Sequence, residues 1–226
     1  MELLIVAAVF VVLVAVFRIL VNVGESSGQS QAHQPSTRTT PNRTKVDSFF
    51  EKQMQEQEER EAVAARMQYK FGKIENALFR RNYDKAMELV SEMMQETDPK
   101  KDSVARHFTL LKILEKLYML REENPIVYDL CLQICDLDFQ NMENFIKACN
   151  SDPFGDKHDS CERFNSPIDL VTTTKAAIIL EKKGDLMSAI EICNMAIRWN
   201  AWDSGKKSFE ERKARLEKKL KRQMEQ

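Results

Sequence analysis

One stretch of the chain gathers side chains that could bind a metal or take part in catalysis. In CNSDPFGDKHDSCERFNS, residues 149–166, the candidate ligands are Cys149, Asp152, Asp156, His158, Asp159 and Cys161. Thiolate, imidazole and carboxylate groups are the usual zinc ligands, but structural zinc sites carry paired C-x2-C motifs and this chain has none. The DPFGD segment is typical of a turn between helices. The sequence therefore predicts no metal site, and Cys149, His158 and Cys161 remain the alternative.

The other reactive side chains lie in helical patterns. Cys131 and Cys135 are four residues apart and would face the same side of a helix, where free cysteines are usually core residues. His107 falls on an apolar helix and is expected in the core or at its edge. A Cys–His nucleophile pair would need a third group to orient the base, and none is evident. The sequence also lacks phosphate-binding-loop, G-x-S-x-G and H-E-x-x-H motifs. It predicts that the protein is not an enzyme and has no cofactor.

Composition and charge exclude further classes of protein. The 226 residues include 34 Lys and Arg against 35 Asp and Glu, and the formal charge of −1 gives no electrostatic reason to expect nucleic acid as a partner. Six Gly and six Pro are few for a fold of strands and turns. Five cysteines without framework spacing are not typical of a disulfide-stapled secreted domain, so a reducing compartment fits them better.

The amino terminus carries a candidate membrane anchor. LLIVAAVFVVLVAVF, residues 3–17, has no polar side chain, and the apolar character resumes after Arg18 and continues to Val23. As a helix, residues 3–23 would be roughly 31 Å long, which matches the hydrocarbon core of a bilayer. A cleaved signal peptide is the alternative, but the run has no basic segment before it and no clear small-residue cleavage site after it. The sequence therefore predicts a single-pass transmembrane anchor.

Charges beside this anchor predict its orientation. The basic residues of the region all follow the fully apolar run: Arg18, Arg38, Arg43 and Lys45. The positive-inside rule then places the C-terminal domain in the cytoplasm. A glycosylation sequon at Asn42 points the other way, because it would be used only outside the cytosol. Residues 24–46 are rich in Ser, Thr and Gln and contain two prolines, which predicts a disordered linker.

From residue 47 onward the apolar residues recur at helical spacing, and no convincing strand pattern occurs. Ser48 and Glu51 match a capping box at the head of a long helix. Further helices are expected at 83–95, from 103, from Pro125, and at 141–150, 167–182, 185–199 and 206–225. The sequence thus predicts an all-α fold of about seven or eight helices, with antiparallel hairpins over residues 47–205.

The same spacing predicts which side chains of the first three of these helices face the core. They are Val63, Met67, Phe71, Ile74 and Leu78; Ala86, Met87, Val90 and Met94; and Val104, Phe108, Leu111, Leu114, Leu117 and Tyr118. The first set recurs at intervals of three and four residues, as one face of an amphipathic helix requires.

KGDLMSAIEICNMAI, residues 183–197, resembles the second helix of a tetratricopeptide repeat. The positions that match are Gly184 at the turn, then Leu186, Ala189, Cys193 and Ala196, with Ala176, Ala177 and Leu180 on the preceding helix. RRNYDKAMELVSEMM resembles a more degenerate copy through Tyr83 and Ala86. The resemblance covers residues 170–203 and, more loosely, 67–100. Thr173 and Ala201 depart from the family pattern, which has Trp and Pro there. The resemblance implies close packing of paired helices and a surface that holds peptides or partner domains.

The carboxyl-terminal segment, residues 206–226, carries nine basic and four acidic side chains. Its sparse apolar stripe predicts a helix that caps the last exposed face of a repeat array. Attraction to anionic lipid is the alternative. Trp199 and Trp202 precede this helix, and they would pack it onto the body or, if exposed, mark a docking site.

Together these features predict a membrane-anchored adaptor or scaffold that recruits a partner protein or peptide through its helical array. One alternative is a subunit of a larger membrane complex, assembled through the long helix at 48–80. The other is a small helical metal-binding protein or enzyme that uses the loop between Cys149 and Cys161.

Overall fold

The computed structural model describes residues 43–150, 163–203 and 208–225. The expected anchor at 3–23, most of the linker and the centre of the 149–166 stretch lie outside these residues. Among the helices that are described, none is both long enough and apolar enough to cross a bilayer. Residues Phe49–Gln226 form one compact unit, and its described core extends from Met67 to Leu216. The fold below is that of this unit.

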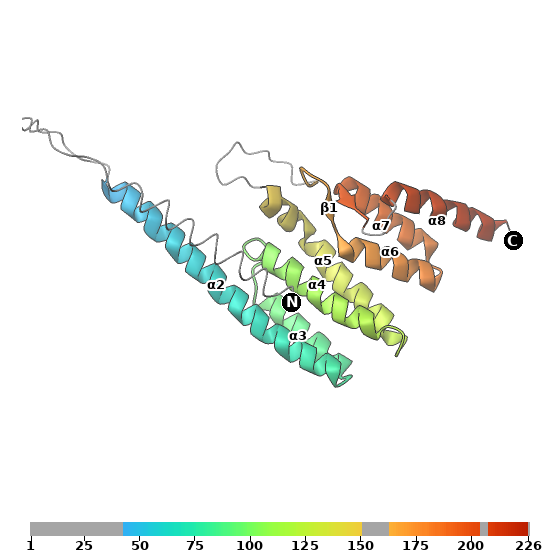
Figure 1. The fold of residues 1–226 in the computed structure, drawn as a ribbon, viewed down its shortest axis with the longest axis horizontal. Coiled ribbons are helices and arrows are strands. Elements are labelled where there is room, and N and C mark those ends of the chain that lie inside the picture. Colours follow the sequence, from blue (N-terminus) through green and yellow to red (C-terminus); the bar gives the residue numbers. More distant parts are fainter. Residues whose placement is uncertain (1–42, 151–162, 204–207, 226) are drawn as a thin grey trace, which may run out of the picture. The chain divides into compact units, whose positions relative to one another are not determined.

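Helices dominate the described part of the chain, which confirms the all-α prediction. The helices are α2 (Arg43–Phe79), α3 (Tyr83–Gln95), α4 (Ser103–Leu120), α5 (Ile126–Asn150), α6 (Val171–Lys183), α7 (Leu186–Arg198) and α8 (Phe209–Met224). Figure 1 shows them following one another in chain order across the unit. The sequence did not predict the strands β1 (Ile168–Asp169) and β2 (Ala201–Trp202), which pair in parallel.

The first helices of successive hairpins, α2, α4 and α6, run parallel to one another. The contacts that set this direction are Phe71 with Lys112 and Glu75 with Lys116 between α2 and α4, then Tyr118 with Lys175 and Glu122 with Lys182 between α4 and α6. In each pair of contacts the residue numbers rise together along both helices. The hairpins are therefore stacked side by side in the same sense, which is compatible with a helical repeat fold.

The second helix of each hairpin returns antiparallel to the first. Lys70 of α2 reaches Glu96 beyond the end of α3, and His107 of α4 pairs with Asp138 of α5. The α6–α7 hairpin closes through a short turn at Gly184. Helix α8 then packs on this last hairpin, where its Phe209 and Leu216 join the cluster that contains Ala177 and Ala189.

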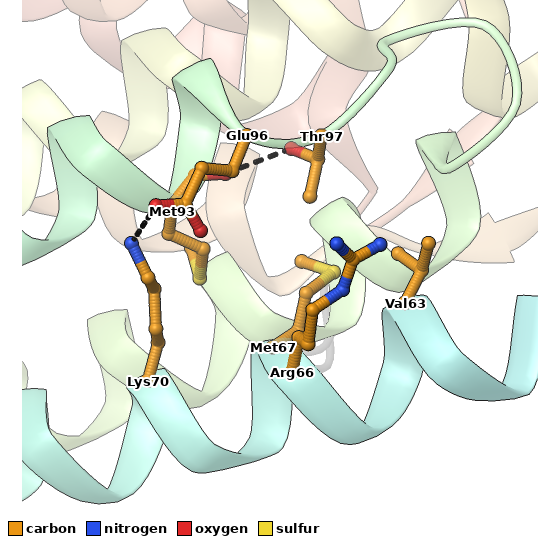
Figure 2. A pocket seen from close by; sticks show the side chains of 7 residues that line it. All are labelled: Val63, Arg66, Met67, Lys70, Met93, Glu96 and Thr97. Carbon is orange, nitrogen blue, oxygen red and sulfur yellow. Dashed lines mark hydrogen bonds and ion pairs between the residues drawn. The ribbon is translucent and has the colours of Figure 1, made fainter.

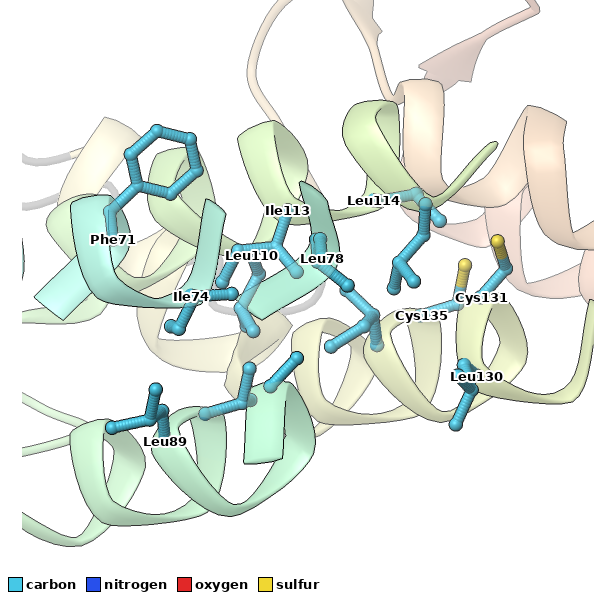
Figure 3. Packing of buried hydrophobic residues seen from close by; sticks show 14 of the residues in the cluster. Phe71, Ile74, Leu78, Leu89, Leu110, Ile113, Leu114, Leu130, Cys131 and Cys135 are labelled. Carbon is cyan, nitrogen blue, oxygen red and sulfur yellow. The ribbon is translucent and has the colours of Figure 1, made fainter. Parts of the chain in front are cut away.

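The main core lies between the first two hairpins. Figure 3 shows Ile74 and Leu78 of α2 beside Leu110 and Ile113 of α4, with Leu89 of α3 on the other side of the cluster. These side chains are at most 8% exposed. Burying a Leu or Ile side chain contributes about 1.5–3 kcal/mol. This shared core joins the hairpins into one body.

The predicted inward faces of two helices need correction. In α3 the prediction missed Leu89 and Met93, which are buried with Ala86 and Val90, while Met87 and Met94 are half-buried and pack against the same core as predicted. In α4, Val104 and Phe108 are exposed. Helix α4 is apolar on most sides, so periodicity alone could not select its face. The buried face instead includes polar residues that bind α5, namely Ser103 and His107.

Two predicted helix boundaries are also wrong. Helix α2 begins at Arg43, soon after Pro41, so Ser48 lies inside the helix and does not cap it. The predicted linker 24–46 therefore ends in a helical segment. The expected separate helix at 141–150 is the second half of α5, which is continuous over 25 residues. Within the continuous helix, Asp138 is fully buried and bonds to His107.

Candidate functional site

Two hairpins of the unit have the same turn geometry. Arg81 and Gly184 are 103 residues apart, and both are left-handed, with φ of 58° and 82°. Each stands immediately before the residue whose side chain caps the second helix, Asn82 or Asp185. The same backbone hydrogen bond closes both turns: Asn82 N to Ala77 O at 2.9 Å and Asp185 N to Leu180 O at 3.0 Å. The turns before α3 and α7 are therefore equivalent.

The helices after these turns are equivalent too. Helices α3 and α7 each have 13 residues, and each places an alanine four residues after its cap. These alanines, Ala86 and Ala189, are at most 1% exposed. Farther along, Val90 corresponds to Cys193 and Met93 to Ala196, and all four side chains are buried. The two helices thus match in length, cap and buried positions, and only some of the matching positions carry the same residue.

The residues chosen from the family resemblance lie mostly inside the last hairpin. Those that are buried are Ala176, Ala177, Leu186, Ala189, Cys193 and Ala196. Burial also raises the pKa of the Cys193 thiol to about 11, so this cysteine is not a reactive thiolate at neutral pH. Leu180 and Tyr83 are half-buried, and Gly184 is exposed at its turn. These residues build the hairpin and do not form an open site.

Helix α8 is fastened to the last hairpin by two ion-pair sites. The fully buried Asp203 accepts hydrogen bonds from Arg212 Nε at 2.7 Å and from Thr174 Oγ1 at 3.3 Å. Glu181 of α6 binds both terminal nitrogens of Arg215, at 2.5 and 2.7 Å. This contact holds the pKa of the Glu181 carboxyl below its usual value. Part of the basic charge of the carboxyl-terminal segment therefore serves contacts within the protein.

Helix α4 presents an exposed apolar stripe, which we call the α4 face and define by Val104, Phe108, Leu111 and Met119. The spacings of four, three and eight residues place all four on one side of the helix, together with the exposed Glu115, which lies four residues from both Leu111 and Met119. Phe108 is 51% exposed and Met119 is 74% exposed, while Leu111 is half-buried. Below the surface, Phe108 contacts the rings of His107 and Phe145 edge-on, at centroid distances of 5.2 and 6.1 Å. The exposed ring is therefore supported from beneath.

Lysine side chains lie on both sides of the α4 face. Toward α2, the ammonium of Lys112 lies 5.9 Å from the centre of the Phe71 ring, and Lys116 pairs with Glu75. Toward α6, the ammonium of Lys175 lies 4.1 Å from the centre of the Tyr118 ring. Cation–π contacts of this kind fix the ammonium but leave its charge in place.

The two tryptophans differ in their surroundings. Trp199 is half-buried and packs against Phe139 of α5, with ring centres 5.8 Å apart. Trp202, in β2, is 64% exposed. Trp199 therefore joins the segment after α7 to α5, whereas Trp202 is the one with the exposure that a docking residue needs.

Of the alternative metal ligands, only Cys149 is described. It is exposed near the end of α5, and partial desolvation raises the pKa of its thiol. His158 and Cys161 lie outside the described residues. Within the part of the chain that is described, no group of three or more His, Cys, Asp or Glu side chains is placed to hold a metal. Burial raises the pKa of the Cys131 thiol to about 12 and that of Cys135 as well, so both behave as core residues.

A buried polar cluster between α4 and α5 was only partly anticipated from the sequence. His107 Nδ1 lies 2.8 Å from Asp138 Oδ1, and its ring stacks on Phe145 with centres 4.0 Å apart. Asn141 donates a hydrogen bond from Nδ2 to the Ser103 carbonyl at 2.7 Å. The sequence predicted a core position for His107, but Asp138 and Asn141 gave no signal. The available hint was that both fall on the apolar face of α5, since Asp138 lies four residues after Ile134 and Asn141 lies four residues before Phe145.

A shallow hollow lies between α2 and the end of α3, and Figure 2 shows its lining. It has an empty volume of about 220 Å³ that includes open solvent. Lys70 closes one side by binding Glu96 at 2.6 Å, and Thr97 donates a hydrogen bond to the Met93 carbonyl. With Lys70 paired to Glu96 and little depth, the hollow offers a ligand few contacts.

Comparison of the chain with protein-family models, with curated proteins and with solved structures finds no match. The function is therefore inferred from the geometry of the hairpins and of the α4 face.

Proposed function

We propose that this protein is a membrane-anchored adaptor whose helical unit, a tetratricopeptide-like array, recruits a partner protein. The observation that carries the proposal is the repeated turn at Arg81 and Gly184, with the same cap and the same buried alanine after each. Stacked hairpins of this kind bury their core between neighbours and leave long helix faces exposed, which suits them to binding other proteins.

One feature departs from a regular array. The middle hairpin has helices of 18 and 25 residues, whereas α3, α6 and α7 each have 13. The second half of α5 is used to pack Phe145 and Ile146 against Phe164 and Leu170. The array we propose is therefore irregular, with two hairpins of equivalent turn and return helix separated by one whose return helix is longer.

Burial offers little support for assembly through the long helix. The inward face of α2 from Met67 onward lies in the protein's own core. Earlier in the helix, residues 54–62 are all exposed, and Met54 is their one large apolar side chain. The remaining contacts of that segment are surface pairs such as Lys52 with Glu56. We assign it the role of a polar spacer between the anchor and the body.

The adaptor proposal is tested by fractionation and capture. We expect the full chain to stay with membranes through alkaline carbonate extraction, and residues 49–226 to be soluble, since this unit contains the whole described core. The same partner should copurify with both proteins from detergent extract. A mature chain that starts near residue 24 would show a signal peptide instead. Glycosylation at Asn42 would place the body on the opposite side of the membrane.

A further inference from the structure

We propose that α2 pairs in parallel with α2 of a second copy of this chain, through the side of the helix that faces away from the core. We call this side the α2 outer face and define it by Ala62, Ala65, Tyr69, Gly72, Asn76 and Phe79. The opposite side of α2 lies in the protein's own core, and the helix before this face is a polar spacer. The inference goes beyond the adaptor function and does not rest on it.

The α2 outer face is open and carries two large rings. Two positions along a helix correspond to a rotation of about 200°, so Tyr69 and Asn76 point away from the buried Met67 and Ile74. Tyr69 is 66% exposed and Phe79 is 82% exposed, and the other members of the face are exposed too. Large exposed rings gathered on one side of a helix mark a protein-binding surface.

The spacing of this face is that of a coiled-coil seam. Its six residues follow one another at alternating intervals of three and four, which are the a and d positions of a heptad. From Ala62 to Phe79 the seam is about 26 Å long. Ala65 and Gly72 lie before and after Tyr69 and are small enough to leave space for two rings. The pattern therefore calls for a partner that is itself a helix.

Asn76 favours a second copy of α2 as that helix. It is the one polar residue of the seam and stands at an a position, where a buried Asn fixes the register of a pair. In a parallel pair in register, Asn76 meets its own counterpart, and one amide donates a hydrogen bond to the carbonyl oxygen of the other. In an antiparallel pair over the same seam, Asn76 would face Ala65 and its amide would lack a partner.

The charges beside the seam favour the same orientation. One edge carries Arg66, Lys73 and Arg80, and none of these forms an ion pair among the described residues of its own chain. Lys73 lies over the Tyr69 ring at 4.5 Å, a contact that leaves its charge in place. An antiparallel pair would place this basic edge against its own copy, whereas a parallel pair places it against the other edge of the partner helix.

That other edge has no basic residue and consists of Glu61, Gln68 and Glu75. Glu75 already binds Lys116 at 2.6 Å, so it contributes less to pairing. Glu61 accepts a hydrogen bond only from the neutral Gln57, at 3.0 Å, and keeps its charge. The main ion pair of the dimer is therefore Glu61 with Arg66 of the second copy, which is the contact of a g position with the following e position.

The first test is sedimentation velocity of residues 49–226, which contain the whole described core, at up to about 300 μM. A seam this short predicts a weak dimer, with a Kd of about 10–100 μM. Tyr69→Glu should weaken it at least about tenfold by placing like charges across the seam. The control Met187→Glu changes a 58% exposed side chain of α7 and should have no effect. A monomer throughout, or equal effects of both variants, would overturn the proposal.

The second test is a charge swap. Arg66→Glu should weaken the dimer about tenfold, because it faces Glu61 of the second copy, and adding Glu61→Arg should restore it. Both side chains are exposed, so neither change disturbs the core. An antiparallel pair would respond in the opposite way, since Arg66→Glu relieves repulsion between its basic edges. Tighter association of Arg66→Glu, or no restoration by the swap, would overturn the parallel pair.

The third test is cysteine cross-linking of the full chain with Cys149→Ser and Cys161→Ser. Ala65→Cys and Phe79→Cys, two heptads apart, should each give a disulfide-linked dimer on oxidation. The neighbouring Ala64→Cys is exposed but lies off the seam and should not. Cross-linking at only one of the two seam positions, or equally at residues 64 and 65, would contradict the parallel pair. A monomer that still captures a cellular partner would overturn the dimer and leave the adaptor function standing.

Discussion

Arg81 and Gly184 are the left-handed residues of two equivalent helical turns, 103 residues apart in the chain. A left-handed backbone costs an L-amino acid roughly 1–2 kcal/mol, and glycine avoids this cost. Arg81 adopts this backbone conformation although it is not glycine. Its guanidinium binds Glu123 through two nitrogens, at 2.8 and 2.9 Å. The same turn is therefore built once with glycine and once with an arginine that also joins the first hairpin to the second.

The first prediction compares two glycine-to-alanine changes of opposite sign. Neither Gly184 nor Gly72 has a neighbouring atom within 4 Å of an added Cβ, so both have room for alanine. Gly184→Ala should lower the free energy of unfolding by about 1 kcal/mol, because alanine is strained at a φ of 82°. Gly72→Ala, inside α2, should raise it by about 0.5–1 kcal/mol through better helix propensity. Urea unfolding of both variants measures the difference, and effects of the same sign would contradict it.

The second prediction concerns the buried alanines of the two equivalent hairpins. Ala86→Leu and Ala189→Leu should each cost about 1–3 kcal/mol, because a larger side chain has no space between the packed helices. Thermal melts should show a clear fall for both variants. The surface change Lys182→Ala removes an exposed pair with Glu122 and a cation–π contact with Tyr128, and it should shift stability by less than about 0.5 kcal/mol. Equal, small effects of all three would show that the hairpins are not closely packed at these alanines.

The sequence predicts helix positions better than helix faces. The second helix was placed at 83–95, as α3 is, because Asn82 and the pattern after it mark a strong start. The left-handed conformation of Gly184 was also predictable, since glycine at a helix end has few other roles. The face of α4 was not, because its apolar residues surround the helix and its contacts with α5 are polar. Thus Phe108, expected in the core, is exposed in the α4 face.

Contacts between distant segments could not be predicted from the sequence, for a different reason. Nothing local to Asp203 indicates that it meets Arg212 and Thr174, since the contact depends on the path of the chain through β2. Likewise the basic residues of α8 suggested a charged surface, but Arg215 is turned toward Glu181. Which charged residues form long-range ion pairs can be told only once the fold is known.

The third prediction concerns the buried contact of Asp203. The side chain of Arg212 is 12% exposed and that of Asp203 is fully buried, so removing one charge leaves the other desolvated without its partner. Asp203→Asn should cost about 3 kcal/mol and should speed hydrogen exchange throughout α8. Lys213→Ala is the control, because its 3.8 Å pair with Glu217 lies on the surface. A cost below about 1 kcal/mol for Asp203→Asn would mean that the buried pair of Asp203 with Arg212 does not hold α8.

The fourth prediction concerns pH. Arg215 holds the pKa of Glu181 below its usual value of 4.5, so the pair stabilises the folded state fully above that pH. The contribution is lost as pH falls through the lowered pKa of the folded state. Glu181→Gln should therefore cost about 1 kcal/mol at pH 7 and progressively less as pH falls through the lowered pKa of the folded state. Unfolding titrations at several pH values measure this, with Glu191→Gln on the exposed side of α7 as the control. A cost for Glu181→Gln that does not change with pH would show that Glu181 acts through packing.

The last prediction concerns the alternative metal site at Cys149, His158 and Cys161. If the protein docks partners without a metal, replacing all three residues with Ser, Gln and Ser should leave the melting temperature and partner binding nearly unchanged. A structural zinc would behave otherwise, because its binding energy is folding energy and its removal unfolds the site. Metal analysis of purified 49–226, with melts in the presence and absence of chelator, separates the two cases. Stoichiometric zinc together with a chelator-dependent fall in melting temperature would make the 149–161 loop a metal site and remove the basis for a docking-only function.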